Sequence, residues 1–389
     1  MVAMARYSGL TLLLLTVLAL AVESKPWGKL LKKSEEDRIP GQYIVVLKPG
    51  FKADAFIQKF STINSTSSAN MTVLSVYRHV FDGFAAKLSD SNVNKFLAME
   101  EVSYIEENGL VKSNFVPGSW GIDRVDQRYL PLDGQAEFTG DGSGVSVYVL
   151  DTGIYPDNMY FAGRAQVGYD AVGGGQDGID CNGHGTHCAG TVGANSYGIA
   201  HGAALYGVRV LNCLGSGTNA QVIDGVDWVA GNAIEPAVAS MSLGGGVSNA
   251  LDAAVASLVN TGVPVSVSAG NNDADACDAS PARSPRAITV GATDIGDKRG
   301  SFSAYGTCVD IFAPGVDITS TWYTGVSAIN TISGTSMACP HVTGALAIAL
   351  GNNGSLTPEE LRTKIIDDST KDVVTDPEEG SPNRLLYIP

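Results

Sequence analysis

Three short segments of this 389-residue chain combine residue types that can carry out nucleophilic chemistry. They are Asp151-Thr-Gly, a glycine-flanked turn around His184, and Gly-Thr-Ser336-Met-Ala-Cys-Pro-His at the start of an apolar helix. A serine hydroxyl is a weak nucleophile that needs an adjacent base, and histidine, with a pKa of about 6.5, suits that role. A buried carboxylate can then fix the imidazole tautomer. Asp151, His184 and Ser336 are therefore predicted to form a catalytic triad, whose activity falls as His184 protonates below about pH 6.5.

Acyl transfer also requires donors for a negatively charged oxygen. Asn271 follows an apolar run that ends in Ser268-Ala-Gly. Its side-chain amide and the backbone N–H of Ser336, at a helix start, are predicted to form an oxyanion hole. No cofactor is needed for this chemistry.

Each of these residues also has an ordinary structural interpretation. A serine at a helix start is commonly an N-cap, and an aspartate after a strand is commonly a turn residue. The pair His184 and His187 has metal-ligand spacing, but no nearby Glu or third His completes a zinc set. An aspartic protease would need a second Asp-Thr/Ser-Gly, and the sequence has none. A protease-like protein without activity is the alternative from another class, and the filled catalytic positions favour the enzyme.

The residues from 144 onward predict the sheet that positions these side chains. Short apolar runs, typical of parallel strands buried on both faces, alternate with helix-like segments such as Ala220–Ala230 and Asn249–Asn260. The runs are Val145–Leu150, Ala204–Leu211, Ala237–Ser242, Val263–Ser268 and Ala287–Gly291. The pattern predicts an α/β domain with a parallel sheet and helices on both faces. Ligands then bind beyond the carboxyl ends of the strands.

The N-terminal part of the chain predicts two further segments. An apolar run from Leu10 to Val22 with small residues at Ala19 and Ala21 indicates a signal peptide over residues 1–21, and hence secretion. Strand-like and helix-like runs then follow in the order β-α-β-β-α-β, typical of a small ferredoxin-like α+β domain. The stretch from Lys112 to Gly121 lacks periodicity and is predicted to be a linker.

The composition limits the possible partners. The formal net charge of −15 disfavours nucleic acid, and no later segment is long and apolar enough to span a membrane. Secretion makes disulfides plausible, but the six cysteines allow 15 full pairings.

The three motifs together resemble the signatures of the subtilisin superfamily, and within it the proteinase K and aqualysin branch. The likeness extends from about Trp120 to Tyr387. It implies a subtilisin-like peptidase domain over residues 114–389 that acts on polypeptides as a monomer, with His184 as the base and His187 structural. Residues 22–113 then resemble the inhibitory propeptide of this family, with its folded domain at about 41–110 and self-cleavage around Lys112–Phe115.

The resemblance also assigns the substrate site. Extended substrate is expected to pair with two segments and to place an apolar or aromatic P1 side chain beside a third. The first segment is Ser242, Leu243, Gly244 and Gly245, and the second is Gly215, Ser216 and Gly217. The third is Ser268, Ala269 and Gly270.

Structural features follow from the same resemblance. It implies disulfides Cys181–Cys213 and Cys277–Cys308 and leaves Cys188 and Cys339 as buried thiols open to mercurials. A structural calcium ion is expected at Asp310 with the carbonyls of Pro285 and Ala287. Sequons begin at Asn64, Asn70 and Asn353. Ser240 and Ser268 depart from the usual family residues, Asn and Ala.

Overall fold

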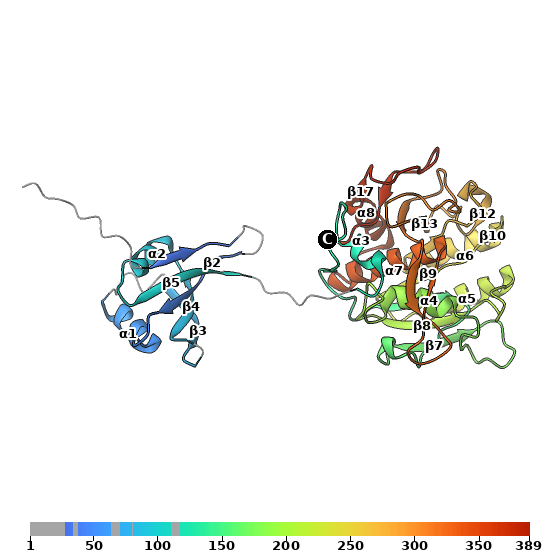
Figure 1. The fold of residues 1–389 in the computed structure, drawn as a ribbon. Coiled ribbons are helices and arrows are strands. Elements are labelled where there is room, and N and C mark those ends of the chain that lie inside the picture. The colour runs from blue at the N-terminus through green and yellow to red at the C-terminus, as the bar shows by residue number, and fades with distance from the viewer. Residues whose placement is uncertain (1–27, 34–37, 64–70, 80, 110–116) are drawn as a thin grey trace, which may run out of the picture. The chain divides into compact units, whose positions relative to one another are not determined.

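The computed structural model describes residues 28–33, 38–63, 71–79, 81–109 and 117–389, and the chain divides into two compact units, Met1–Ser113 and Asn114–Pro389 (Figure 1). This division falls where the sequence predicts the end of the propeptide. The predicted signal peptide, the expected self-cleavage stretch and the sequons at Asn64 and Asn70 lie outside the described residues.

The first unit is a small α+β domain with sheet order β1-β5-β2-β4-β3. Its elements are β1 (Lys29–Leu31), β2 (Arg38–Leu47), α1 (Ala53–Ile63), β3 (Met71–Tyr77), β4 (Gly83–Leu88), α2 (Asp90–Leu97) and β5 (Val102–Gly109). Apart from β1, which adds a strand parallel to β5, this is the predicted order. Phe56, Phe60 and Phe96 from the two helices pack with Phe84 from the sheet, with the rings of Phe60 and Phe96 edge to face.

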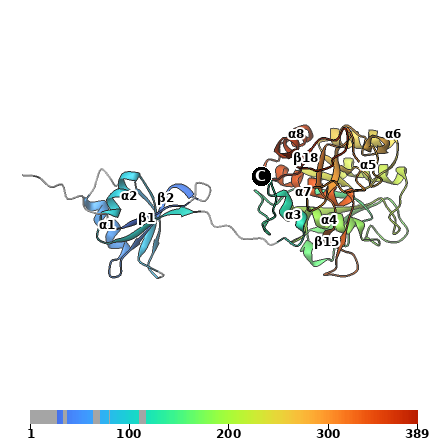
Figure 2. The same ribbon diagram turned by 45° about the horizontal axis from the view of Figure 1, so that its top comes forward.

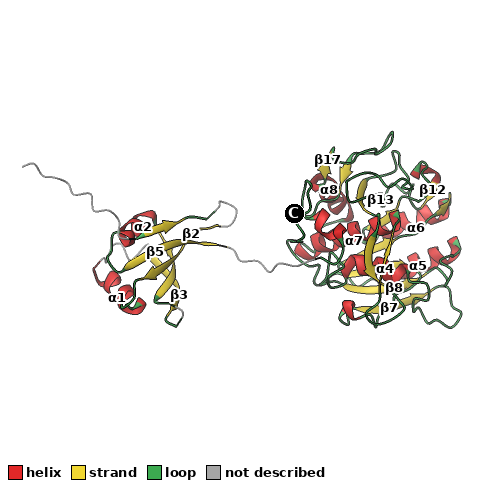
Figure 3. Ribbon diagram, in the orientation of Figure 1, coloured by secondary structure: helices red, strands yellow, loops and turns green. Residues whose placement is uncertain are grey.

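The second unit is built on a nine-stranded sheet of order β17-β18-β14-β13-β11-β9-β6-β8-β7 (Figure 3). Its strands are β6 (Ser146–Asp151), β7 (Ala165–Asp170), β8 (Ala204–Arg209), β9 (Ala237–Met241), β11 (Val265–Ser268), β13 (Ile288–Thr293), β14 (Ile311–Pro314), β17 (Thr370–Lys371) and β18 (Arg384–Leu385). The strands from β14 to β7 in this order are all parallel. All five apolar runs picked out in the sequence are strands of this sheet.

Helices cover both faces of this sheet (Figure 2). Side chains alternate between the faces along β6: Val147 and Val149 join the core formed with α4 and α7, whereas Tyr148 and Leu150 join the core formed with α5 and α6. The helices are α3 (Trp120–Val125), α4 (His184–Gly193), α5 (Asn219–Asn232), α6 (Asn249–Asn260), α7 (Thr335–Asn352) and α8 (Pro358–Asp368), with short 3-10 turns η2 (Met159–Phe161) and η3 (Ala276–Asp278).

Helix α7 runs through the core and is buried on every side from Thr335 to Leu350. Small residues permit this close packing: a Cβ on Gly344 would lie 2.5 Å from Ile199. Two small two-stranded ladders complete the unit, β10 (Gly245–Gly246) with β12 (Ala279–Ser280), and β15 (Ile318–Thr321) with β16 (Ile329–Ile332). No helix within the described part of the chain is long and apolar enough to cross a membrane.

Candidate active site

Asp151 and His184 meet at the carboxyl end of the sheet. Asp151 is the last residue of β6 and is fully buried, and His184 is the first residue of α4. The ring Nδ1 of His184 lies 2.8 Å from Asp151 Oδ1, which also accepts the backbone N–H of Thr152 at 2.7 Å. A carboxylate in this position holds the proton on Nδ1 and leaves Nε2 free to act as a base.

The turn before His184 is held by a second buried carboxylate, Asp180. Its Oδ1 accepts the Thr152 hydroxyl at 2.8 Å and the backbone N–H groups of Asn182 and Gly183 at 2.9 Å each. Gly183 adopts φ 110°, and a Cβ there would also lie 2.5 Å from the Trp322 ring. Glycine is therefore required at this position, and the loop can present the imidazole in one orientation.

Ser336 lies in the first turn of α7, and Pro340 shapes its surroundings. Residue 340 would normally donate its N–H to the carbonyl of residue 336, but proline has no N–H. The Ser336 carbonyl instead accepts the Ser242 hydroxyl at 2.8 Å and the Cys188 thiol at 3.4 Å. Because the Cys188 sulfur also lies 3.9 Å from His184 Nδ1, this thiol connects the serine and histidine motifs directly.

The hydroxyl of Ser336 donates to the carbonyl of Ser242 over 3.3 Å in this structure. Catalytic hydrogen bonds are often long or differently directed before substrate binds. The serine side chain is nearly buried, with 9% of the residue exposed, so it faces a confined space.

Two opposing effects act on the pKa of His184. Burial lowers it, but the negative charge of Asp151 and the hydrogen bond to its carboxylate outweigh burial, and the pKa lies well above the ordinary value. His187 behaves differently: burial lowers its pKa to about 4, and its Nε2–H donates to the Ile318 carbonyl at 3.0 Å. The first histidine can therefore accept a proton, whereas the second is a neutral packing residue.

Asn271 is oriented by Thr335. Its side-chain oxygen accepts the Thr335 backbone N–H at 2.8 Å and the Thr335 hydroxyl at 2.9 Å. The same hydroxyl accepts the N–H of Gly270 at 3.1 Å. Since the oxygen of the amide is occupied on this side, its NH₂ group remains available as a donor.

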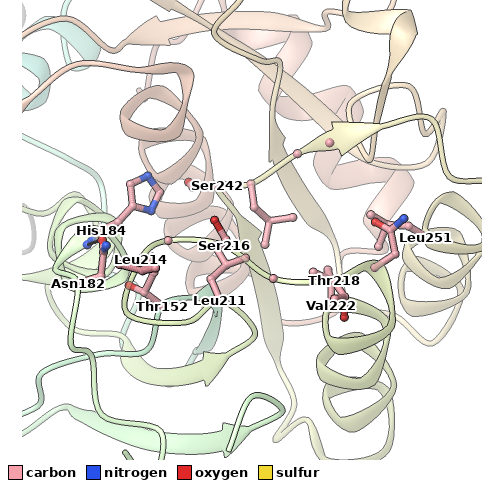
Figure 4. A pocket seen from close by; sticks show the side chains of 16 residues that line it. Thr152, Asn182, His184, Leu211, Leu214, Ser216, Thr218, Val222, Ser242 and Leu251 are labelled. Atoms are coloured by element: carbon pink, nitrogen blue, oxygen red, sulfur yellow. Dashed lines mark hydrogen bonds between the residues drawn. The ribbon is translucent and has the colours of Figure 1, made fainter. Parts of the chain in front are cut away.

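A cleft of about 510 Å³ runs past His184 between α5, α6 and the ends of the strands (Figure 4). It brings together the histidine and both segments that the sequence assigned to substrate pairing. Besides these it is lined by Thr152, Asn182, Leu211, Leu214, Thr218, Asn219, Val222 and Leu251. The apolar members of this set come from the loop before α5 and from both helices, and the only ionisable group in the lining is His184.

The third predicted substrate segment does not line this cleft. Ser268 ends β11 and donates its hydroxyl to the Leu243 carbonyl at 3.4 Å, while the Ala269 N–H donates to the Val290 carbonyl at 3.0 Å. Ser268 therefore supports the neighbouring substrate segment from behind, whereas Ala269 is bound to β13.

Both predicted disulfides are present, Cys181–Cys213 and Cys277–Cys308, and Cys188 and Cys339 are buried free thiols. The first bridge joins the turn before His184 to the loop at 212–217, which lines the cleft. Cys339 lies near Ser240, 3.8 Å away, in a buried cluster of hydroxyl groups beneath the sheet.

At the expected calcium site of Asp310, the structure places a positive side chain. The guanidinium of Arg362 occupies the site, donating to Asp310 Oδ1 at 2.5 Å and to the carbonyls of Ala287 at 2.6 Å and Pro285 at 3.4 Å. The oxygens that were expected to bind the ion are therefore already bound to a positive side chain.

Two other carboxylates retain unused oxygens. Oδ1 of Asp123 and Oδ1 of Asp126 are buried and have no hydrogen-bond partner in the described structure. Burial raises the pKa of Asp126 to about 6, and the charges of Asp123 and Asp133 add to the effect. Burial also raises the pKa of Asp123. Because carboxylate oxygens are the preferred ligands of Ca²⁺, this cluster has the chemistry to hold a divalent cation.

Sequence reasoning missed several residues of the site. Thr335 directly precedes Ser336 and lies inside the serine motif. Asp180 precedes His184 by four residues and lies beside the histidine motif. The apolar lining residues Leu211, Val222 and Leu251 carry no motif, and no local signal distinguishes them from core residues.

A fold with a parallel sheet, a buried carboxylate and a histidine at its carboxyl edge, and a serine at the start of a central helix defines a hydrolase of the serine class. Residues 142–385 match the model of the Subtilase family, and residues 42–113 match that of Peptidase inhibitor I9. The chain belongs to the subtilase family and is a subtilisin-like serine proteinase with an inhibitor-type propeptide.

Proteins similar to this chain come from bacteria and fungi. An extracellular serine proteinase of Thermus sp. (strain Rt41A) is 45% identical over 98% of this chain and 99% of its own length. Proteinase R of Parengyodontium album is 40% identical over 94% of each chain. The crystal structure of a cold-adapted subtilisin-like serine proteinase has a TM-score of 0.68 and 51% identity, covering 69% of this chain and 98% of that one.

Proposed function

We propose that this protein is a secreted endopeptidase that cleaves extended polypeptides through an acyl-enzyme at Ser336. Ser336 Oγ attacks the scissile carbonyl carbon while His184 Nε2 takes the hydroxyl proton. His184 then gives this proton to the leaving amine, and water hydrolyses the ester by the same route. Asp151 orients the imidazole, and the Asn271 amide with the Ser336 N–H binds the oxyanion.

The observation that carries this proposal is the 2.8 Å hydrogen bond between His184 Nδ1 and the fully buried Asp151. It supports a base whose proton is held on Nδ1, which leaves Nε2 to accept the serine proton. For attack, the Ser336 hydroxyl turns from the Ser242 carbonyl toward this nitrogen.

An apolar or aromatic P1 side chain beside Ser268–Gly270 remains part of this proposal, and the lining of the cleft supports apolar side chains at neighbouring substrate positions. Leu211, Val222, Leu243 and Leu251 line it, and apart from His184 no ionisable side chain in the lining offers a partner for a charged substrate group. The backbones of Gly215–Gly217 and Ser242–Gly245 can pair with substrate as added strands.

A structural calcium ion fits the carboxylates of Asp123 and Asp126 rather than Asp310. The propeptide, residues 22–113, acts as an intramolecular inhibitor until self-cleavage around Lys112–Phe115 releases it. The mature enzyme acts as a monomer. A glycan at Asn353 fits its exposed position after α7.

Labelling with a serine-directed phosphonate tests the reaction. The secreted, processed enzyme takes up one label per chain, and the Ser336→Ala variant takes up none. Asn271→Leu should retain substrate affinity while kcat falls by about 10²–10³. Retention of label in Ser336→Ala, or unchanged turnover in Asn271→Leu, excludes the assigned roles.

A further inference from the structure

Three oxygen atoms from two distant segments converge on one side chain of α8. Asp310 lies just before β14, and the carbonyls of Pro285 and Ala287 precede β13. The Arg362 guanidinium donates to all three, with one nitrogen on the two carbonyls and the other on the carboxylate. The second carboxylate oxygen of Asp310 accepts the Thr289 N–H at 2.9 Å.

We propose that Arg362 is a built-in cation that replaces a divalent ion at this junction, and that the same oxygens form a latent calcium site which opens when the arginine side chain is removed. The chain thereby holds α8 against the Pro285–Ala287 segment without depending on free calcium.

The chemistry of the two cations explains why one excludes the other. A guanidinium is always charged and presents planar donors that match a carboxylate and neighbouring carbonyls. A calcium ion would need the same oxygens. The single charge of Asp310 is already balanced by Arg362, and a second guanidinium, that of Arg384, lies 3.5 Å from the Asp310 carbonyl. Binding of a calcium ion, with its two positive charges, is therefore unfavourable here while Arg362 is present.

The junction connects the C-terminal helix to the support of the substrate site. The chain from Ala279 to Ala287 begins with β12, which pairs with Gly245 and Gly246 of β10. The Ser280 hydroxyl also accepts the Ser248 N–H at 2.9 Å. Loss of the Arg362 contacts should therefore loosen the segment behind the cleft.

The test counts calcium ions bound to the mature enzyme after its active site is blocked with a sulfonyl fluoride, which prevents autolysis. Arg362→Ala should bind one more ion per chain than the wild type. Calcium at ~10 mM should raise the Tm of this variant by roughly 3–6 °C more than that of the wild type, for a dissociation constant near ~1 mM. The double variant Arg362→Ala/Asp310→Asn should return to the wild-type number of ions.

A nearby arginine provides the matched control. Arg286 belongs to the same segment and pairs with Glu359 at 3.7 Å, at the start of α8. Arg286→Ala also removes one positive charge but should bind no additional ion. Equal stoichiometry in wild type and Arg362→Ala overturns the proposal, and so does an extra ion in Arg286→Ala, which would indicate a general charge effect.

A second measurement applies if Arg362→Ala does not fold. Asp310→Asn with the arginine intact should bind as many calcium ions as the wild type. Loss of one ion in this variant would show that Asp310 already binds calcium in the native protein, and the proposal would be wrong.

Discussion

At the scale of single residues, the geometry of the site depends on side chains that form hydrogen bonds where the backbone alone leaves a polar group without a partner. Pro340 removes one helical hydrogen bond, and the freed Ser336 carbonyl is then held by Ser242 and Cys188. Thr335 uses its hydroxyl and its N–H to orient Asn271. These hydrogen bonds hold the groups of the site in place before substrate binds, which lowers the free energy needed to reach the transition state.

The pH dependence of activity should report the pKa of His184. Its neutral form is the base, so activity is lost as the pH falls through this pKa. The sequence alone predicts a decline below about pH 6.5, whereas the structure raises the pKa of His184 because of Asp151. The midpoint of the acid limb of kcat/KM should therefore lie above 6.5. In Asp151→Asn it should shift to lower pH, while kcat falls by about 10⁴. An acid limb at or below 6.5 in the wild type would contradict this assignment.

Cys188 should make the enzyme sensitive to mercuric ion. Its sulfur lies 3.9 Å from His184 Nδ1, so a metal bound there would disturb the imidazole and the Ser336 carbonyl together. Burial raises the pKa of the thiol, so we expect it to react more slowly than an exposed thiol. Residual activity should fall with one equivalent of mercury per chain.

The second buried thiol provides the control for this prediction. Cys188→Ala should be resistant to mercuric ion, and Cys339→Ala should remain as sensitive as the wild type. Equal resistance of both variants would place the inhibitory reaction elsewhere.

At the scale of elements, the segment from α3 to residue 137 should couple stability to calcium and to pH. The folded pKa of Asp126, about 6, exceeds the ordinary Asp value of 3.8. The folded state therefore holds the proton more tightly, and stability without calcium should decrease as the pH rises from about 4 to above 6. Calcium competes with this proton, so it should raise the Tm more at pH 8 than at pH 5.

Calorimetry of the active-site-blocked enzyme, with calcium and with a chelator, measures this effect. Asp126→Asn should abolish most of the difference between the two pH values, whereas Asp310→Asn should preserve it. A calcium-induced shift of equal size at pH 5 and pH 8 would exclude Asp126 as a ligand.

At the scale of the whole molecule, the chain consists of two units with separate cores, and one of them is of an inhibitor type. The first unit has its own aromatic core and matches an inhibitor family. If Ser336 performs the cut between the units, Ser336→Ala should be recovered as the uncleaved precursor, and wild-type samples should begin near residues 112–116. Mass spectrometry and N-terminal sequencing of both proteins check this, and a processed Ser336→Ala protein would require another protease.

Much of the architecture was predictable because its signals are local. The parallel strands are continuous apolar runs, and α6 extends over Asn249–Asn260 as its periodicity predicts. Strand β7 was missed because Ala165–Asp170 carries a glycine and polar residues and is largely half-buried, so it lacks the apolar run of an inner strand. The short hairpin β15–β16, with its exposed and polar second strand, gave no clear pattern either.

The sequence by itself determined the reaction class, because a nucleophile, a base, a carboxylate and an amide donor stand in motifs that few other functions require. The tertiary structure decided the features that depend on contacts with residues elsewhere in the chain. The apolar lining of the cleft, the raised pKa of His184 and the arginine at the expected calcium position all arise from contacts between residues far apart in sequence. Burial and charge act through space, so a motif read along the chain cannot reveal which cation or carboxylate will lie beside it.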